Sequence, residues 1–135
     1  MKDIKFITKD IVLFFHEQLI NFYGGSIEIR DENLLDSALA QPKATFEGKY
    51  LHDTLYKMAA AYGYHLCNNH PFIDGNKRIA FVVMDTFLQR NNLEIIASEK
   101  EVYKTMIYLA SGQLSKEKLA LWLKKNTSAI NKKHF

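Results

Sequence analysis

One nine-residue run of this sequence brings together a titratable base, a carboxylate, a glycine and two cations. The run reads His70-Pro71-Phe72-Ile73-Asp74-Gly75-Asn76-Lys77-Arg78, and an apolar segment follows it directly. Histidine titrates near neutral pH, so His70 is a candidate general base for a hydroxyl that attacks a phosphate. The alternative for His70 is a purely structural role as a cap at the end of the preceding helix.

The second half of the run has the features of an anion site. A helix that begins near Gly75 leaves the backbone N–H groups of its first turn without partners, and its dipole favours negative charge there. Cations in a first turn oppose that dipole, at a cost of roughly 0.3–1 kcal/mol each, and a bound phosphate removes the conflict. The alternative is two solvated cations near a helix start. The pattern predicts a phosphate-binding cradle made by Gly75, Asn76, Lys77 and Arg78.

Two further residues of this region have two candidate roles each. Asp74 precedes the expected helix, where aspartate commonly serves as an N-cap, but a carboxylate beside an anion site is also a suitable Mg²⁺ ligand. Cys67 lies three residues before His70, so a Cys–His dyad is conceivable. A single cysteine among apolar neighbours is more often buried and inert. The residues alone leave both pairs of alternatives open.

The rest of the sequence predicts an all-α, single-domain fold that mounts this run between two central helices. The segments 58–62 and 79–84 are apolar nearly all round, which is typical of buried helices, and the run joins them. A loop between two core helices is a rigid support for a site. Residues 43–52 lack helical periodicity and predict a loop or a small hairpin. Apolar spacing and capping residues predict six helices, over about residues 8–23, 31–42, 53–69, 75–89, 98–112 and 115–123, with N-caps at Asp31, Ser98 and Ser115.

Composition places the chain among ordinary globular proteins. Its 135 residues are 47% hydrophobic, which suits one compact domain. No apolar run approaches the roughly 18 residues of a membrane span, and the N-terminus lacks the apolar core of a secretory signal. Cys67 is the single cysteine, so no intrachain disulfide can form and a cytoplasmic location is expected.

The positive charge of the chain is concentrated at its C-terminal end. The net charge is +3, and four lysines stand in the last twelve residues, so the remainder carries 3 − 4 = −1. These are Lys124, Lys125, Lys132 and Lys133. We expect a domain over residues 1–125 and a solvated basic tail over residues 126–135. Nucleic-acid binding rests on this tail alone and is not expected, and neither is a membrane partner.

The nine-residue run resembles the central motif of the Fic/Doc (Fido) superfamily, and its Lys-Arg ending is similar to the Doc branch, the "death on curing" toxins. The resemblance extends over about residues 6–123. It includes Tyr23-Gly24-Gly25, Ile29-Arg30-Asp31, Leu34-Leu35-Asp36-Ser37-Ala38-Leu39-Ala40-Gln41-Pro42, Phe87-Leu88, Asn91-Asn92, Ala110-Ser111-Gly112-Gln113-Leu114 and Trp122-Leu123.

This resemblance implies a six-helix Fic fold with a small flap near residues 41–50 that docks the backbone of a target protein beside the site. It implies ATP and Mg²⁺ as cofactors, with His70 as the general base and Asp74 as the Mg²⁺ ligand. Residues 75–78 would then bind the phosphates, and Arg78 would also count among the catalytic residues.

The resemblance also favours one reaction over another. Fic members that transfer AMP typically carry Gly-Asn-Gly-Arg and a second Arg three residues later, whereas this chain has Lys77 and Phe81 at the two diverging positions. This departure favours Doc-type phosphoryl transfer from ATP to a Ser or Thr hydroxyl of a protein. In Doc-like toxins the target is translation elongation factor Tu, so a block of translation is implied.

Restraint of such a toxin is expected from outside the chain. The sequence contains no Ser/Thr-x-x-x-Glu-Gly/Asn inhibitory motif, which implies a partner antitoxin that acts in trans. Two other functions stay open, a Fic-type protein AMP transferase and a non-catalytic module that binds nucleotide or an antitoxin. The module is disfavoured by the presence together of His70, Asp74, Asn76 and Arg78.

Overall fold

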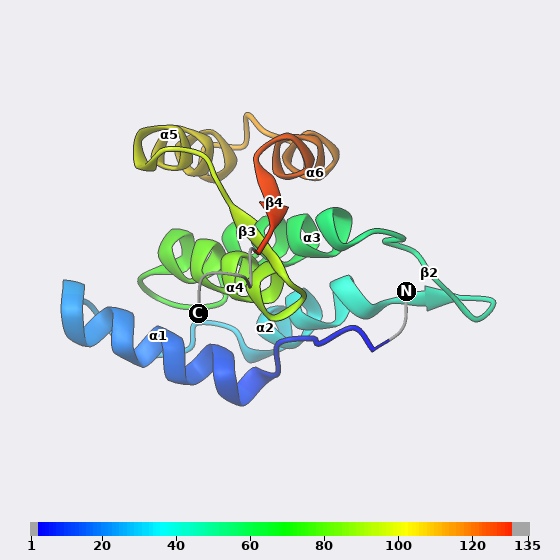
Figure 1. Cartoon of the computed structure of the whole chain (residues 1–135). Coiled ribbons are helices and arrows are strands. Elements are labelled where there is room, and N and C mark those ends of the chain that lie inside the picture. The colour runs from blue at the N-terminus through cyan, green and yellow to red at the C-terminus, as the bar shows by residue number, and fades with distance from the viewer. Residues whose placement is uncertain (1–2, 131–135) are drawn as a thin grey trace.

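The computed structural model describes residues 3–130, which form six helices and two small antiparallel strand pairs (Figure 1). The prediction of a mainly helical fold with six helices is confirmed. No helix in this part of the chain is long and apolar enough to cross a membrane. The elements follow in the order α1 (Lys9–Tyr23), α2 (Glu32–Ala40), the 3-10 helix η1 (Gln41–Lys43), β1 (Thr45–Phe46), β2 (Lys49–Tyr50), α3 (Leu55–Asn68), α4 (Asn76–Arg90), β3 (Leu93–Ile95), α5 (Glu99–Ala110), α6 (Lys116–Lys125) and β4 (Thr127–Ala129).

Helices α3 and α4 form the centre of the molecule, with α1 and α2 on one side and α5 and α6 on the other (Figure 1). The apolar residues 58–62 of α3 are fully buried, as predicted. The two central helices approach closely at Gly63, where a Cβ atom would lie 2.8 Å from Sδ of Met84. On α4 the apolar stretch is only partly buried, because Phe81 and Val82 line a surface groove.

Side-chain caps fix where several of the helices begin. The three predicted N-caps each accept a hydrogen bond from the backbone N–H three residues further on, at 3.0–3.2 Å, and they are Asp31, Ser98 and Ser115. Thr54, which the sequence reasoning did not single out, caps α3 in the same way at 3.1 Å. These bonds satisfy N–H groups that a helix start leaves free. The start of α4 differs, because its N-cap is Gly75 and no side chain caps it.

Strands β1 and β2 form the small hairpin that was one of the two expectations for residues 43–52. The hairpin leads into the start of α3, whereas His70 follows its end, and a helix of 14 residues is about 21 Å long. The Phe6 ring confirms this placement, since its centroid lies 5.9 Å from those of both Tyr50 in the hairpin and Phe87 near the end of α4. The expectation of a flap beside the site is therefore wrong for this hairpin, which lies at the opposite end of α3.

Strand β4 pairs with β3 in an antiparallel register, with Glu94 opposite Ser128. Two further backbone bonds extend this pairing, from Ile96 N–H to Asn126 O at 2.7 Å and from Ile130 N–H to Asn92 O at 3.0 Å. The predicted tail over residues 126–135 is thus wrong in its first part, because residues 126–130 belong to the folded domain. The lysines at 132 and 133 lie outside the described residues.

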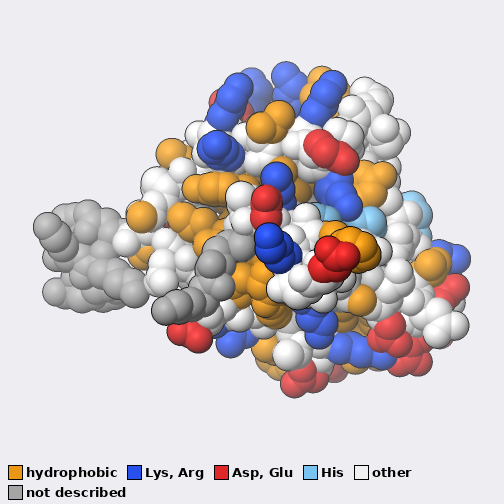
Figure 2. Space-filling view, turned by 90° about the vertical axis from the view of Figure 1, so that its right-hand side faces the viewer, with side chains coloured by type: hydrophobic (Ala, Val, Ile, Leu, Met, Phe, Trp, Pro, Cys, Tyr) orange, Lys and Arg blue, Asp and Glu red, His pale blue; other side chains and the backbone are white. Residues whose placement is uncertain are grey.

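A groove of about 720 Å³ opens at the hairpin end, between residues 51–57 and α6. Figure 2 shows this end, where histidine side chains reach the surface close to lysine and arginine side chains. His52 and Lys116 line the groove, and Nζ of Lys116 donates to Nε2 of His65 at 3.4 Å. No residue of the His70–Arg78 run lines it, so the candidate site lies elsewhere.

Candidate functional site

The nine-residue run forms a loop that crosses from the end of α3 to the start of α4. His70 is exposed and has a φ of 49°, a left-handed conformation that is uncommon for a residue with a side chain. Asn69 is the C-cap of α3, and His70 occupies the next position, where a left-handed residue commonly ends a helix, so the structural alternative for His70 stays open beside the proposed chemical one. Arg30 holds this turn, because its Nε donates to His70 O at 2.6 Å and its NH2 group to Asn69 O at 2.9 Å.

Residues 24–31, which connect α1 to α2 and which we call the strap, pair with the loop along its length. Ile29 and Phe72 form an isolated antiparallel bridge. Ile73 N–H donates to Glu28 O at 3.1 Å, and Arg30 N–H donates to Pro71 O at 2.7 Å. The loop is therefore held by backbone hydrogen bonds as one strand of a short ladder, although it contains no regular element.

The Asn76 side chain closes the loop on itself. Its Oδ1 accepts from Phe72 N–H at 3.0 Å and its Nδ2 donates to Phe72 O at 2.9 Å. Both polar groups of the amide are thus used within the loop. In the predicted phosphate cradle, Asn76 would therefore contribute its backbone N–H rather than its side chain.

Asp74 does not cap α4, so the N-cap alternative for this residue is wrong. Its Oδ2 accepts instead from Ser26 N–H in the strap, at 2.8 Å, and the residue as a whole is exposed. Among residues 3–130, Oδ1 of Asp74 has no hydrogen-bond donor. The carboxylate is therefore oriented by one oxygen and presents the other at the surface of the loop.

His16 of α1 supports the loop from inside the protein. Only 2% of its surface is exposed, and its ring stacks on Phe72 with centroids 3.7 Å apart and planes inclined by 11°. Its Nε2 lies 2.7 Å from the carbonyl oxygen of Asp74. Sequence reasoning missed this residue, because a histidine within an amphipathic helix gives no signal of the loop it will meet 58 positions later.

Lys77 and Arg78 extend from the first turn of α4, and each lies over an aromatic ring. Nζ of Lys77 is 5.6 Å from the ring centroid of Tyr103 on α5. The guanidinium carbon of Arg78 is 4.0 Å from the ring centroid of Tyr23, at the end of α1. Such contacts contribute roughly 0.5–1 kcal/mol at exposed sites. They hold the two cations beside the uncapped backbone N–H groups of the helix start.

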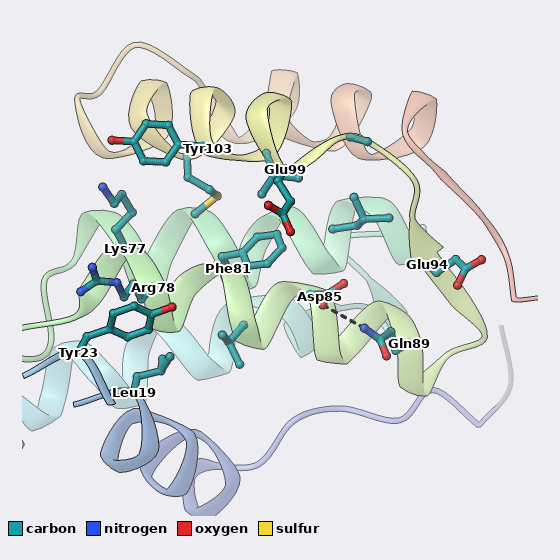
Figure 3. A pocket seen from close by; sticks show the side chains of 15 residues that line it. Leu19, Tyr23, Lys77, Arg78, Phe81, Asp85, Gln89, Glu94, Glu99 and Tyr103 are labelled. Atoms are coloured by element: carbon teal, nitrogen blue, oxygen red, sulfur yellow. Dashed lines mark hydrogen bonds between the residues drawn. The ribbon is translucent and has the colours of Figure 1, made fainter. Parts of the chain in front are cut away.

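A groove of about 740 Å³ runs from these cations along α4, between α1, β3 and α5 (Figure 3). Asp85 and Glu94 lie at the end away from Lys77. Burial raises the pKa of the Asp85 carboxyl, and a hydrogen bond from Gln89 at 2.9 Å opposes the shift. A volume of about 300–1,000 Å³ is usual for small-molecule sites. The apolar side chains of the groove include Leu19, Phe81, Val102 and Met106.

Comparison with known proteins places these residues within a protein family. Residues 6–88 match the model of the Fic/DOC family, and this match covers more than half of the chain. The matched part contains the strap, the loop and the first turn of α4. The chain belongs to the Fic/DOC family.

Both of the curated relatives considered are Doc proteins, which confirms the expected branch of the Fic/DOC family. "Toxin Doc" of Mycolicibacterium smegmatis (strain ATCC 700084 / mc(2)155) is 41% identical over 75 residues, which are 56% of this chain and 58% of that protein. "Protein kinase doc" of Escherichia phage P1 is 25% identical over 117 residues, which are 87% of this chain and 91% of that protein. The stronger similarity thus spans little more than half the length of its relative.

The burial of Cys67 rules out the Cys–His dyad that the sequence left open. Cys67 is 1% exposed, and burial raises the pKa of its thiol to about 11, although the charge of Lys77 acts in the opposite direction. A thiol with this pKa carries almost no thiolate at neutral pH, and the thiolate is the nucleophile. The Cys–His dyad is therefore wrong, and Cys67 is a core residue of α3.

Proposed function

We propose that this chain is a Doc-type toxin that transfers the γ-phosphoryl group of ATP to a Ser or Thr hydroxyl of a protein. The observation that carries the proposal is the first turn of α4, where Lys77 and Arg78 stand beside backbone N–H groups that no side chain caps. Without an anion, cations at this position oppose the helix dipole. A chain of phosphates would meet the cations and the N–H groups together.

Phosphoryl transfer depends mainly on positioning and on neutralising the charge of the phosphates. The hydrogen-bonded loop would supply the first, and Lys77 and Arg78 would supply the second. In the proposed reaction, the bond between the γ-phosphorus and the bridging oxygen breaks, and a bond from the hydroxyl oxygen to the γ-phosphorus forms. His70 accepts the proton of the hydroxyl, and ADP leaves. The apolar groove next to Lys77 is the proposed place for the nucleoside.

Asp74 fits the proposed role of Mg²⁺ ligand. Among the described residues only Oδ2 of this exposed carboxylate receives a hydrogen bond, which leaves Oδ1 available to a hard cation. Mg²⁺ is usually held by one or two carboxylates together with substrate phosphates. When bound, it would neutralise charge on the phosphates.

Two features support phosphoryl transfer over AMP transfer. Phe81 lines the groove at the position where AMP-transferring Fic members typically carry their second Arg, and it offers no charge to a phosphate. Lys77 takes the place of their second Gly. The name of the phage P1 relative, "Protein kinase doc", points in the same direction.

The target, the partner and the location are proposals that follow from the same resemblance. The proposed target is elongation factor Tu, whose modification would block translation. The proposed partner is an antitoxin, and one that covers the groove beside Lys77 and Arg78 would exclude nucleotide from the cradle. Both the target and the partner require the toxin to act in the cytoplasm.

The proposal is tested by incubating the protein with Mg-ATP and either a bacterial lysate or purified elongation factor Tu. ATP labelled on the γ-phosphate should label a protein, whereas ATP labelled on the α-phosphate should not. The intact mass of the product should increase by one phosphoryl group. An increase by one AMP would replace the kinase by the AMP transferase, and nucleotide binding without any labelling would favour the non-catalytic module.

Matched variants connect the labelling to the proposed site. His70→Ala should abolish transfer, and Lys77→Ala should reduce kcat/KM by about a hundred-fold, the size expected for loss of one charge-stabilising group. Lys104→Ala is the control, because Lys104 also lies over a ring, that of Tyr108 at 5.9 Å, but does not line the groove. Equal activity of the Lys77 and Lys104 variants would contradict the assigned cradle.

A further inference from the structure

We infer that His16 is a positioning residue, which sets the orientation of the Asp74 carboxylate by holding the backbone of the loop from inside α1. The catalytic meaning of this role rests on the proposed function, in which Asp74 is the Mg²⁺ ligand. The geometric role does not depend on that function. It stands on the contacts that His16 makes with the residues on either side of the Asp74 side chain.

The contact between His16 and Asp74 has a defined direction. A backbone carbonyl oxygen can only accept a hydrogen bond, so Nε2 of His16 carries the proton and donates it to Asp74 O across 2.7 Å. The stacked ring of Phe72, at 3.7 Å, fixes the plane of the imidazole. One buried ring thus contacts the residues at both ends of the segment 72–74.

The loop also rests directly on α1 through Gly75. A Cβ atom at this position would lie 3.4 Å from both Nε2 of His16 and Cδ1 of Ile20, at the short end of ordinary van der Waals contact. Gly75 has a φ of 80°, which a glycine adopts without strain. The left-handed backbone at the point where the loop meets α1 therefore favours glycine, and Gly75 lies against the same ring that donates to Asp74 O.

The strap fixes the same residue from the other side. Ser26 N–H donates to Oδ2 of Asp74 at 2.8 Å, and a Cβ atom on Gly25 would lie 3.0 Å from the Asp74 Cβ atom. The backbone of Asp74 is thus held by α1 and its carboxylate by the strap. If the carbonyl lost its donor, the peptide could rotate and the carboxylate would leave Ser26.

The position of His16 in α1 argues against a purely structural role. Val12 and Ile20 lie one turn before and one turn after it, and both are buried and apolar. An apolar residue at position 16 would continue this stripe and would pack equally well. The chain instead has a histidine at this position, and its Nε2 bonds the loop at Asp74 O. Burying a polar group destabilises the fold unless the group is hydrogen-bonded, as Nε2 is here.

Three substitutions separate the hydrogen bond from the packing. His16→Phe keeps a ring for stacking but has no donor. His16→Gln keeps a donor at about the reach of Nε2, whereas His16→Asn has the same amide on a shorter side chain. Val12→Ala is the matched control, because it creates a cavity on the same face of α1 without touching the loop.

The first readout is hydrogen exchange of the Ser26 amide, which needs no activity. We expect its exchange to accelerate by about ten-fold or more in His16→Phe and His16→Asn, and to stay close to the wild-type rate in His16→Gln and Val12→Ala. The Leu34 amide, which Asp31 caps at 3.0 Å, should exchange at the wild-type rate in all four. Wild-type protection of Ser26 in both His16→Phe and His16→Asn would overturn the inference, and if His16→Phe does not fold, the pair of amide variants decides.

The second readout is the Mg²⁺ concentration that gives half-maximal transfer. It should rise by roughly ten-fold in His16→Phe and His16→Asn, the usual effect of losing a group that orients a metal ligand, and change little in His16→Gln and Val12→Ala. A uniform fall in kcat in all four variants, with unchanged Mg²⁺ dependence, would contradict the positioning role. If the wild-type protein transfers no phosphate, the proposed function fails, and the exchange of Ser26 still decides the role of His16.

Discussion

At the scale of single residues, the site divides its work between exposed and buried side chains. His70 and Asp74 are exposed on the loop and are the groups proposed to react or to bind. His16 is buried and, as proposed, acts only through them. Asn76 has a polar side chain in the motif, yet both ends of its amide bond the backbone of Phe72. The motif therefore mixes residues that are proposed to take part in the reaction with residues that build the loop.

Cys67 gives a residue-scale prediction, because it lies in the core three positions before His70. The pKa of its thiol is raised from 9.0 to about 11 by burial, so the thiolate fraction is roughly a hundred-fold lower than in an unfolded chain. In native buffer a thiol-specific reagent should therefore modify it at least that much more slowly than in urea. Cys67→Ala should retain transfer activity within about two-fold and lower the unfolding free energy by about 1 kcal/mol. Rapid native labelling, or loss of transfer in a folded Cys67→Ala protein, would restore a chemical role for the thiol.

At the scale of elements, the sequence predicted the features that depend on neighbouring residues, such as the starts of helices. Asp31, Ser98 and Ser115 were identified as N-caps because a cap and its helix lie within a few residues of each other. The pairing of the strap with the loop was missed, since the residues of the strap that the family resemblance includes carry no local signal of a loop that follows much later in the chain. The pairing of β3 with β4 was missed for the same reason, because each strand has only three residues.

The position of the hairpin shows a different kind of limit. Its existence was one of the expectations for residues 43–52, but the family resemblance placed it beside the site. The length of α3 separates the two in this chain. In the site itself, the residues of the motif were found from the sequence, whereas the role of Asp74 at the start of α4 was decided by Gly75, which is the N-cap. Spacing in the sequence does not show which of the adjacent residues Asp74 and Gly75 is the N-cap of α4.

Strand β4 gives an element-scale prediction. A chain that ends at Lys125 loses the β3–β4 ladder and the bonds from Ile96 to Asn126 and from Ile130 to Asn92. We expect a loss of about 2 kcal/mol in the free energy of unfolding, since several backbone hydrogen bonds and part of the cover of β3 disappear together. Urea unfolding followed by circular dichroism measures this loss. A chain that ends at Ile130 is the control, and equal stability of the two truncated chains would show that the ladder contributes nothing.

At the scale of the whole molecule, two separate grooves are lined by cations, and beside one of them the cation lies close to histidine rings. Lys77 and Arg78 line the groove along α4. The groove between residues 51–57 and α6 is lined by Lys116 and His52, and Nζ of Lys116 also donates to Nε2 of His65, in the last turn of α3, at 3.4 Å. Burial first, then the charge of Lys116, lowers the pKa of His65 to about 4, and the pKa of His52 is lowered as well. Burial and the charge of Lys116 therefore both favour the neutral form of the two imidazole rings.

This environment gives a prediction for stability against pH. Between pH 6.5 and about 4, the unfolded chain protonates His65 while the folded chain does not, so the unfolding free energy should fall as the pH falls through this window. Because the ring is only partly buried, we expect its share of the loss to be about 1–2 kcal/mol. In His65→Gln that share should be absent from urea unfolding curves measured at pH 7 and pH 4.5. Lys116→Met should reduce it, because the charge that opposes protonation is removed. Identical pH profiles for the wild type and His65→Gln would contradict the assignment.

The contacts that hold the loop join residues that are far apart in the sequence, so they determine when the loop can form during synthesis. Arg30 and His70 are 40 positions apart, Ser26 and Asp74 are 48 apart, and His16 and Asp74 are 58 apart. During synthesis, α1 and the strap leave the ribosome well before the loop that they hold. The loop over residues 70–75 therefore takes its shape only after α3 and the start of α4 have emerged. If the chain has the proposed activity, it is inert up to that point during synthesis, and the proposed antitoxin can meet the site as soon as the site exists.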